Sequence, residues 1–274
     1  MPSAPDLRPI QRSRLRLAAG RAYYTFMRRM LWRFGGYRFA RDRDETSLPH
    51  LHAAHATPLL RKLRDVDMQL QVNKITNLRL AAAKLDGILV RPGETFSFWR
   101  LVGKTSARKG YLPGLVLFCG GFHAGVGGGL CQLTNLIYWM ALHTPLTITE
   151  RYRHSFDVFP DANRMQPFGS GATCVYPYRD LWLRNDTPDT YQLHIFFTDT
   201  HLCGEWRVSS PPRCRYEVFE KDHRMQLEYW GGYSRHNTIL RRRFSLPEDE
   251  LLGEEHVTEN HALMMYQPFL PSGE

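Results

Sequence analysis

The chain has 274 residues, of which 43% are hydrophobic and 23% are charged. This length fits one large domain or one domain with an appendage, and the composition excludes a wholly disordered chain. The net charge of +9 resides in residues 1–43, which hold eleven arginines and only two acidic residues. The five cysteines form no CxxC pair, which argues against a structural zinc site and favours a reducing, cytosolic setting.

The first predicted element is a helix over residues 11–35, within a basic N-terminal segment at 1–45. Aromatic and aliphatic side chains lie among its arginines, but no run approaches the ~18 to 20 apolar residues of a membrane span. The runs are also too short for a signal peptide, so we expect a cytoplasmic protein. Two interpretations of the helix remain open: it lies on an anionic inner membrane leaflet, or it docks on the domain. We expect no nucleic-acid partner, because no recognition motif accompanies the charge.

Residues 46–200 are predicted to form the main domain, in which helices come early and strands come late. In chain order we expect a loop at 42–57, one or two helices within 58–86, a strand at 88–90, a strand at 114–119, a glycine-rich loop at 120–129 and a buried helix from Cys131 to near Pro145.

From residue 146 onward the pattern is typical of short strands separated by turns. Candidate strands include 180–184, 190–198, 204–209, 214–220 and 225–230. Residues 201–274 are predicted to be a β-rich extension packed on the same domain. The fold class is therefore α+β, with N-terminal helices, a buried helix opened by a Gly-Gly-Gly-x-Cys turn and a mainly antiparallel C-terminal sheet.

The glycine turn is the most informative chemical feature of the chain. Gly127, Gly128 and Gly129 lead through one leucine into Cys131, at the start of the predicted buried helix. Glycines let backbone N–H groups face a ligand, and a helix start favours a thiolate. Cys131 is therefore a candidate nucleophile beside an oxyanion site. The alternative is a tight turn in which Cys131 is a small buried hydrophobic residue.

A thiol nucleophile needs a base, and the base needs a group that orients it. His154 is the leading candidate base, with His123 in the glycine loop as its rival and as a candidate substrate-binding residue. Asp180, and then Glu150, are candidates for the orienting carboxylate. The backbone N–H of Gln132, directly after the cysteine, is a candidate oxyanion donor. The three glycines are candidate substrate-binding positions.

Four strings in this order resemble the VanW family over about residues 46–198. They are LDGILVRPGETFSFW at 85–99, GGGLCQ at 127–132, ERYRHS at 150–155 and DLWLRNDT at 180–187. Some exported members of that family look like L,D-transpeptidases that use a cysteine, and the matching cysteine here is Cys131. Many relatives carry Asp where this chain has Gly171, so that role is lost here or moved to Asp161 or Asp180.

The resemblance implies a peptidoglycan stem peptide or precursor as the substrate, without a cofactor or a metal. The predicted reaction is acyl transfer, ending in transpeptidation or in carboxypeptidase-type hydrolysis. A non-catalytic accessory protein that binds such precursors, or a partner in glycopeptide resistance, is the alternative. A zinc site formed by Cys131, His123 and His154 is a weaker one, because the ligand spacing is not diagnostic.

Overall fold

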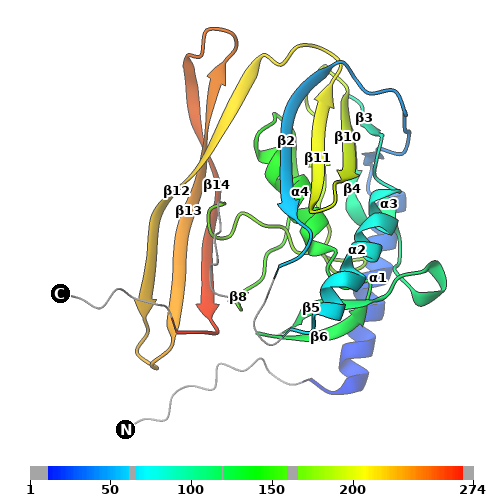
Figure 1. The fold of residues 1–274 in the computed structure, drawn as a ribbon, viewed down its shortest axis with the longest axis vertical. Helices are drawn as coiled ribbons and strands as arrows, with labels where there is room; N and C mark the ends of the chain where they lie inside the picture. The colour runs from blue at the N-terminus through cyan, green and yellow to red at the C-terminus, as the bar shows by residue number, and fades with distance from the viewer. Residues whose placement is uncertain (1–11, 62–65, 119, 159–165, 268–274) are drawn as a thin grey trace.

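A computed structural model describes residues 12–61, 66–118, 120–158 and 166–267 of the chain. Within these ranges it contains four α-helices, one 3₁₀ helix, three four-stranded sheets and a two-stranded hairpin, which confirms the α+β class. The longest strands form a sheet along one side of the molecule, and α1, α2 and α3 gather on the other side (Figure 1). None of the helices in the described ranges combines the length and the apolar character needed to cross a membrane.

Most of the helical structure comes early in the chain, as predicted. The helices are α1 (Arg14–Phe34), α2 (Met68–Ala82), α3 (Phe98–Val102) and α4 (Cys131–Leu142), with η1 (Ala107–Lys109) between the last two. Side-chain caps fix three of the starts, because an oxygen that accepts a backbone N–H replaces the missing helical acceptor. Ser13 caps α1 and Asp67 caps α2 in this way. Ser97 caps α3 by accepting from the Arg100 N–H.

The first sheet brings three chain segments together at one end of its strands. Its order is β1 (Arg38–Phe39), β4 (Glu94–Ser97), β9 (Trp182–Arg184) and β7 (Thr147–Glu150), with only the β1–β4 pair parallel. In this register Ser97 and Glu150 both lie opposite Trp182. The end of β4 and the end of β7 therefore flank the start of β9, one on each side.

The second sheet is antiparallel and carries the core on one face. Its order is β2 (His50–Pro58), β11 (His201–Val208), β10 (Tyr191–Phe197) and β3 (Ile88–Val90). The prediction of a loop at 42–57 is wrong for the part that forms β2. Alanine and histidine have little strand propensity, but here pairing with β11 at the edge of the sheet determines the structure. The predicted boundary at residue 200 falls within the β10–β11 hairpin, so β11 belongs to this core sheet.

The buried helix α4 packs against β2 and β11. Gly204 of β11 allows this close approach, since a Cβ there would lie 2.7 Å from the Cε atom of Met140. Leu133, Leu136 and Ile137 of α4 are completely buried between the sheet and the rest of the core. The helix predicted from Cys131 is thus confirmed. Its packing in the core holds Cys131, its first residue, in place.

Three of the four strands of the third sheet follow the core in sequence. Its order is β12 (Cys214–Leu227), β13 (Tyr233–Ser245), β14 (Leu251–Met264) and β8 (Phe156–Asp157), with β8 parallel to β14. Two strands predicted at 214–220 and 225–230 are largely one strand with a change of register between Lys221 and Arg224. The separate long ribbons in Figure 1 therefore begin at Cys214, not at residue 201.

The glycine-rich segment before Cys131 is also a strand for most of its length. β5 (Pro113–Phe118) and β6 (Gly121–Val126) form an antiparallel hairpin. The loop predicted at 120–129 is therefore wrong for β6, because glycine has a low strand propensity that pairing with β5 overrides. The hairpin packs on α2 and ends directly at the glycine turn.

Candidate functional site

The glycine turn before α4 is held by backbone contacts that only glycine permits. The Gly127 N–H donates to the Leu112 carbonyl and the Gly128 N–H to the Gly125 carbonyl, each at 2.9 Å. A Cβ at Gly128 would lie 2.2 Å from the Gly114 carbonyl oxygen, and Gly127 and Gly129 both have positive φ. The turn is therefore a fixed structure between the hairpin and α4.

Two polar residues of α2 brace this turn from below. Asn77 Nδ2 donates to the Gly128 carbonyl at 2.9 Å, and the aliphatic stem of Lys74 covers Gly129. Lys74 Nζ donates to Gln71 at 2.8 Å, and burial lowers the pKa of Lys74 to about 8. These residues were not predicted from the sequence, although polar side chains at 71, 74 and 77 recur every three residues on one helix face.

Cys131, the first residue of α4, lies among two other reactive side chains. Its Sγ atom is 3.8 Å from Sγ of Cys174 and 4.0 Å from the Cys174 carbonyl oxygen. A hydrogen bond with Cys174, together with a hydrogen bond and the charge of His154, lowers the pKa of Cys131 well below its usual value despite burial. The contact with Cys131, together with burial, raises the pKa of Cys174.

Three chain segments converge to build this cluster. The Thr134 hydroxyl donates to the Ala172 carbonyl at 2.6 Å, and the Ala172 N–H donates to Asn135 at 2.7 Å. The Thr173 N–H in turn donates to the Tyr152 carbonyl at 2.7 Å. Cys174 and His154 therefore arrive beside Cys131 on neighbouring backbones that hydrogen bonds hold in register.

The structure brings the predicted pair Cys131 and His154 together and adds Cys174, which sequence reasoning counted but did not place. No local pattern marks Cys174, since it reaches the site through the bridge between Thr173 and Tyr152. Gly171 lies close by, and a Cβ there would meet the Asn135 side chain at 2.8 Å. Asp161, the other position considered for the missing acid, lies outside the described residues.

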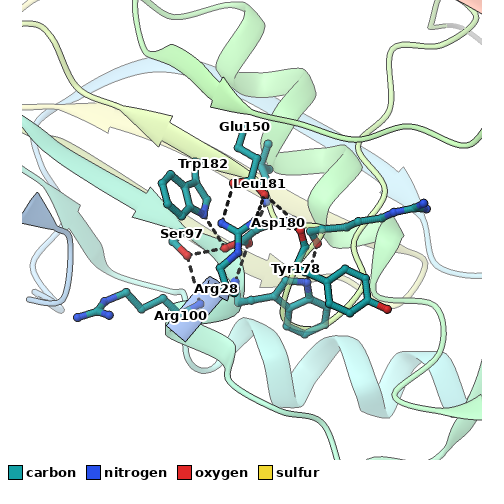
Figure 2. Close-up of polar contacts among 10 residues, drawn as sticks. Arg28, Ser97, Arg100, Glu150, Tyr178, Asp180, Leu181 and Trp182 are labelled. Carbon is teal, nitrogen blue, oxygen red and sulfur yellow. Dashed lines mark hydrogen bonds and ion pairs between the residues drawn. The ribbon is translucent and has the colours of Figure 1, made fainter. Parts of the chain in front are cut away.

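Asp180 is fully buried beside this cluster, at the junction of β4, α3 and β9 (Figure 2). Its carboxylate accepts four hydrogen bonds of 2.6–2.9 Å, from the Ser97 hydroxyl, the Trp99 and Leu181 N–H groups and the Trp182 indole. Burial raises the pKa of Asp180 to about 6, although these hydrogen bonds favour the ionised form. Both carboxylate oxygens thus bind groups other than His154, and the orienting role of Asp180 stays a prediction.

Glu150, the second candidate for the orienting carboxylate, pairs with an arginine of α1. It forms an ion pair with the buried Arg28 of α1, with one N–O distance of 2.7 Å, and accepts a hydrogen bond from the Asp180 N–H. Arg28 also donates to the Tyr178 carbonyl at 2.9 Å and stacks over the Trp182 ring (Figure 2). This set of contacts docks α1 on the first sheet. A role of Glu150 toward His154 stays a prediction.

The other predicted binding residues lie around the turn. The Gln132 N–H donates to the Gly129 carbonyl at 3.1 Å, and its side chain donates to Thr57 and Pro58 of β2. His123 lies on the exposed β6 strand and contacts the Phe118 ring. Across the described ranges, no group of three or more His, Cys, Asp and Glu side chains is arranged to hold a metal ion.

Comparison with known proteins identifies relatives of this chain. Residues 73–207 match the family profile described as VanW like protein. The vancomycin B-type resistance protein VanW of Enterococcus faecalis is 35% identical over 234 residues, which cover 85% of each protein. The uncharacterized protein YoaR of Bacillus subtilis is 37% identical over 82 residues, which cover 30% of this chain and 27% of YoaR. No solved structure matches. The chain thus belongs to the VanW family.

Proposed function

We propose that this protein is a cysteine-dependent acyl transferase that acts on peptidoglycan stem peptides or their precursors. The observation that carries the proposal is the place of the Cys131 sulfur at the start of α4, in hydrogen-bond contact with His154, which lowers the pKa of Cys131. A thiolate next to an imidazole is the arrangement that activates sulfur for attack on a carbonyl. The similarity to a vancomycin resistance protein supports a substrate from the cell wall.

In the proposed reaction, the Cys131 sulfur attacks an amide carbonyl of the stem peptide. His154 takes up the thiol proton and returns it to the leaving amine, so that a thioester remains on Cys131. An acceptor amine or water then cleaves the thioester, which gives transpeptidation or carboxypeptidase-type hydrolysis. Proton transfer by a positioned side chain contributes about 10²–10⁴-fold to such rates.

The oxyanion of the tetrahedral intermediate needs backbone donors close to Cys131. The Gln132 N–H already donates to Gly129, so we assign this role to the N–H groups just before it. Among the described residues, the N–H groups of Gly129, Leu130 and Cys131 have no protein acceptor. They lie at the positive end of the α4 dipole, which favours a developing negative charge.

The test is the rate at which a thiol reagent alkylates each cysteine as a function of pH, measured by peptide mass spectrometry. In the wild-type protein we expect Cys131 to react with an apparent pKa well below that of Cys203, which burial raises. His154→Ala should move the Cys131 profile to higher pH, whereas His123→Ala on the exposed hairpin should leave it unchanged. A Cys131 profile that matches Cys203 would refute the proposal.

Turnover is tested separately, with synthetic stem peptides and an acceptor amine. The wild-type protein should form a thioester at Cys131, and Cys131→Ala should abolish both the thioester and the product. If Cys131→Ala instead keeps full activity in cells, the protein acts as an accessory that binds precursors without catalysis.

We further propose that α1 places the protein on the anionic cytoplasmic surface of a membrane. Arg28 marks the docked side of the helix, while Tyr23, Phe26, Met27 and Phe34 follow the opposite side at spacings of three, four and seven residues. Phe26 is 59% exposed and Phe34 is 69% exposed, so this face is apolar and uncovered within the described residues. An apolar face among arginines is typical of helices that lie in a membrane interface.

A basic hollow next to this face supports the same assignment. It is lined by Arg29, Trp32, Arg33, Phe34 and Arg100, at the junction of α1 and α3. Three of these five residues are arginines, and arginine binds the phosphate of a lipid headgroup with paired hydrogen bonds. The apolar face and the headgroup hollow lie along the same helix.

Flotation with lipid vesicles tests this placement. The wild-type protein should float with phosphatidylglycerol vesicles and not with phosphatidylcholine vesicles, and salt should weaken the binding. Phe26→Ser combined with Phe34→Ser should lose the binding. Leu251→Ser, which removes an exposed apolar side chain from the third sheet, should keep it. Binding by the double variant equal to wild type would refute the role of α1.

A further inference from the structure

The two cysteines of the candidate site are close enough to react with each other. The Sγ atoms of Cys131 and Cys174 lie 3.8 Å apart, and each residue stands on a different chain segment. A disulfide needs an S–S distance of about 2.05 Å, so the two sulfurs must approach by only about 1.8 Å. The hydrogen bonds of Thr134 and Asn135 to Ala172 hold the two segments at this separation.

The two thiols have unequal environments. Cys131 is half-buried at a helix start, whereas Cys174 is buried. The contact between them lowers the pKa of Cys131 and raises that of Cys174. An oxidant therefore meets a thiolate at Cys131, with a protonated thiol directly behind it.

We propose that Cys131 and Cys174 form a peroxide-sensitive dithiol site that closes into a reversible disulfide. Closure occupies the sulfur of Cys131, which holds the site inactive until a reductant reopens it. The formation of the disulfide stands on the geometry of the two thiols alone. Its effect on activity rests on the function proposed above for Cys131.

The oxidation takes place in two steps with hydrogen peroxide or another hydroperoxide as the oxidant. The Cys131 thiolate attacks one peroxide oxygen, the O–O bond breaks, and Cys131 becomes a sulfenic acid while hydroxide leaves. Cys174 then loses its proton, its sulfur attacks the sulfenic sulfur, and a second hydroxide leaves as the S–S bond forms. The protons of the two thiols convert the two hydroxides to water, so each peroxide consumes two thiols.

The resolving thiol protects the nucleophile from permanent loss. A sulfenic acid without a nearby thiol is oxidised further to sulfinic acid, which ordinary thiol reductants do not reverse. With Cys174 at 3.8 Å, disulfide formation is intramolecular and competes directly with that second oxidation. Cys203, buried on β11 in the core sheet, is a matched cysteine outside the pair.

The experiment treats the reduced, full-length protein with increasing hydrogen peroxide and maps its peptides by mass spectrometry without reductant. We expect the peptides that carry Cys131 and Cys174 to be joined, and dithiothreitol to separate them. In Cys174→Ala the joined species should be lost and sulfinic acid should accumulate at Cys131. Cys203→Ala should retain the joined species.

Wild-type protein that accumulates sulfinic acid at Cys131 without joined peptides overturns the inference. The wild-type map alone decides this, whether or not the Cys174→Ala variant folds. Stem-peptide turnover by the reduced protein is measured in parallel. Joined peptides in a protein without turnover would refute only the proposed function, whereas turnover without joined peptides would refute only this inference.

Discussion

The pKa of Asp180 provides a quantitative test of the buried cluster beside the site. The change is Asp180→Asn, which keeps the shape of the side chain and removes its charge. One of the two oxygens becomes an amide nitrogen, and an indole such as that of Trp182 can only donate. If the amide faces the indole, the variant loses one buried hydrogen bond, which costs about 1–3 kcal/mol at every pH.

The dependence on pH isolates the charge. Burial raises the pKa of Asp180 to about 6, from about 3.9 in an unfolded chain. Between these two values the folded state binds more protons than the unfolded state, so the contribution of Asp180 to stability is complete below pH 4 and falls as pH rises through 6. The shift of about 2 units corresponds to about 3 kcal/mol.

The assay is urea unfolding followed by tryptophan fluorescence at several pH values, for wild type and Asp180→Asn. The titrating groups that the two proteins share cancel in the difference between their free energies of unfolding. The lost indole hydrogen bond adds the same amount to that difference at every pH. We expect the free energy of unfolding of wild type, minus that of the variant, to fall by about 3 kcal/mol between pH 4 and pH 7. A difference that stays constant or grows with pH would refute the reasoning, because the four hydrogen bonds would then outweigh burial.

Three further variants test the contacts around the site, and a fourth, Gly20→Ala on α1, serves as a control. Glu150→Ala should lower the free energy of unfolding by about 3–5 kcal/mol, measured by thermal unfolding, since it leaves the Arg28 guanidinium buried without its partner. A loss below 1 kcal/mol would show that α1 docks by other contacts. Gly128→Ala should lower the melting temperature by driving a Cβ to 2.2 Å from the Gly114 oxygen, whereas Gly20→Ala on α1, with open space around it, should raise stability by about 0.5–1 kcal/mol. Between pH 8 and 10.5 the unfolded state binds one more proton at Lys74 than the folded state, so the free energy of unfolding of wild type should rise by about 3 kcal/mol over that range. Lys74→Met should remove this gain. A parallel pH dependence in both proteins would contradict the lowered pKa of Lys74.

Local signals in the sequence were sufficient for the three longer helices, α1, α2 and α4, but not for the short α3 and η1. The apolar run after Cys131 predicts α4, and three glycines before it predict a turn, because both depend on a few consecutive residues. The arginine-rich segment likewise predicts α1. The strands β2 and β6 were missed, since alanine, histidine and glycine give no alternating pattern and the partner strand determines the structure there.

The sequence by itself thus determined the α+β class, the helix that carries Cys131 and the candidate partner His154. Only the tertiary structure decided what surrounds them. Asp180 binds Ser97 across 83 residues of sequence, Glu150 binds Arg28 across 122, and Cys174 meets Cys131 across 43. Such pairings depend on strand register and on helix docking, which are long-range properties that no local pattern encodes. For this reason the contacts of Asp180 and Glu150, the two candidates for the carboxylate that orients His154, could not be predicted from the sequence: these acids hold β4, β9 and α1 together.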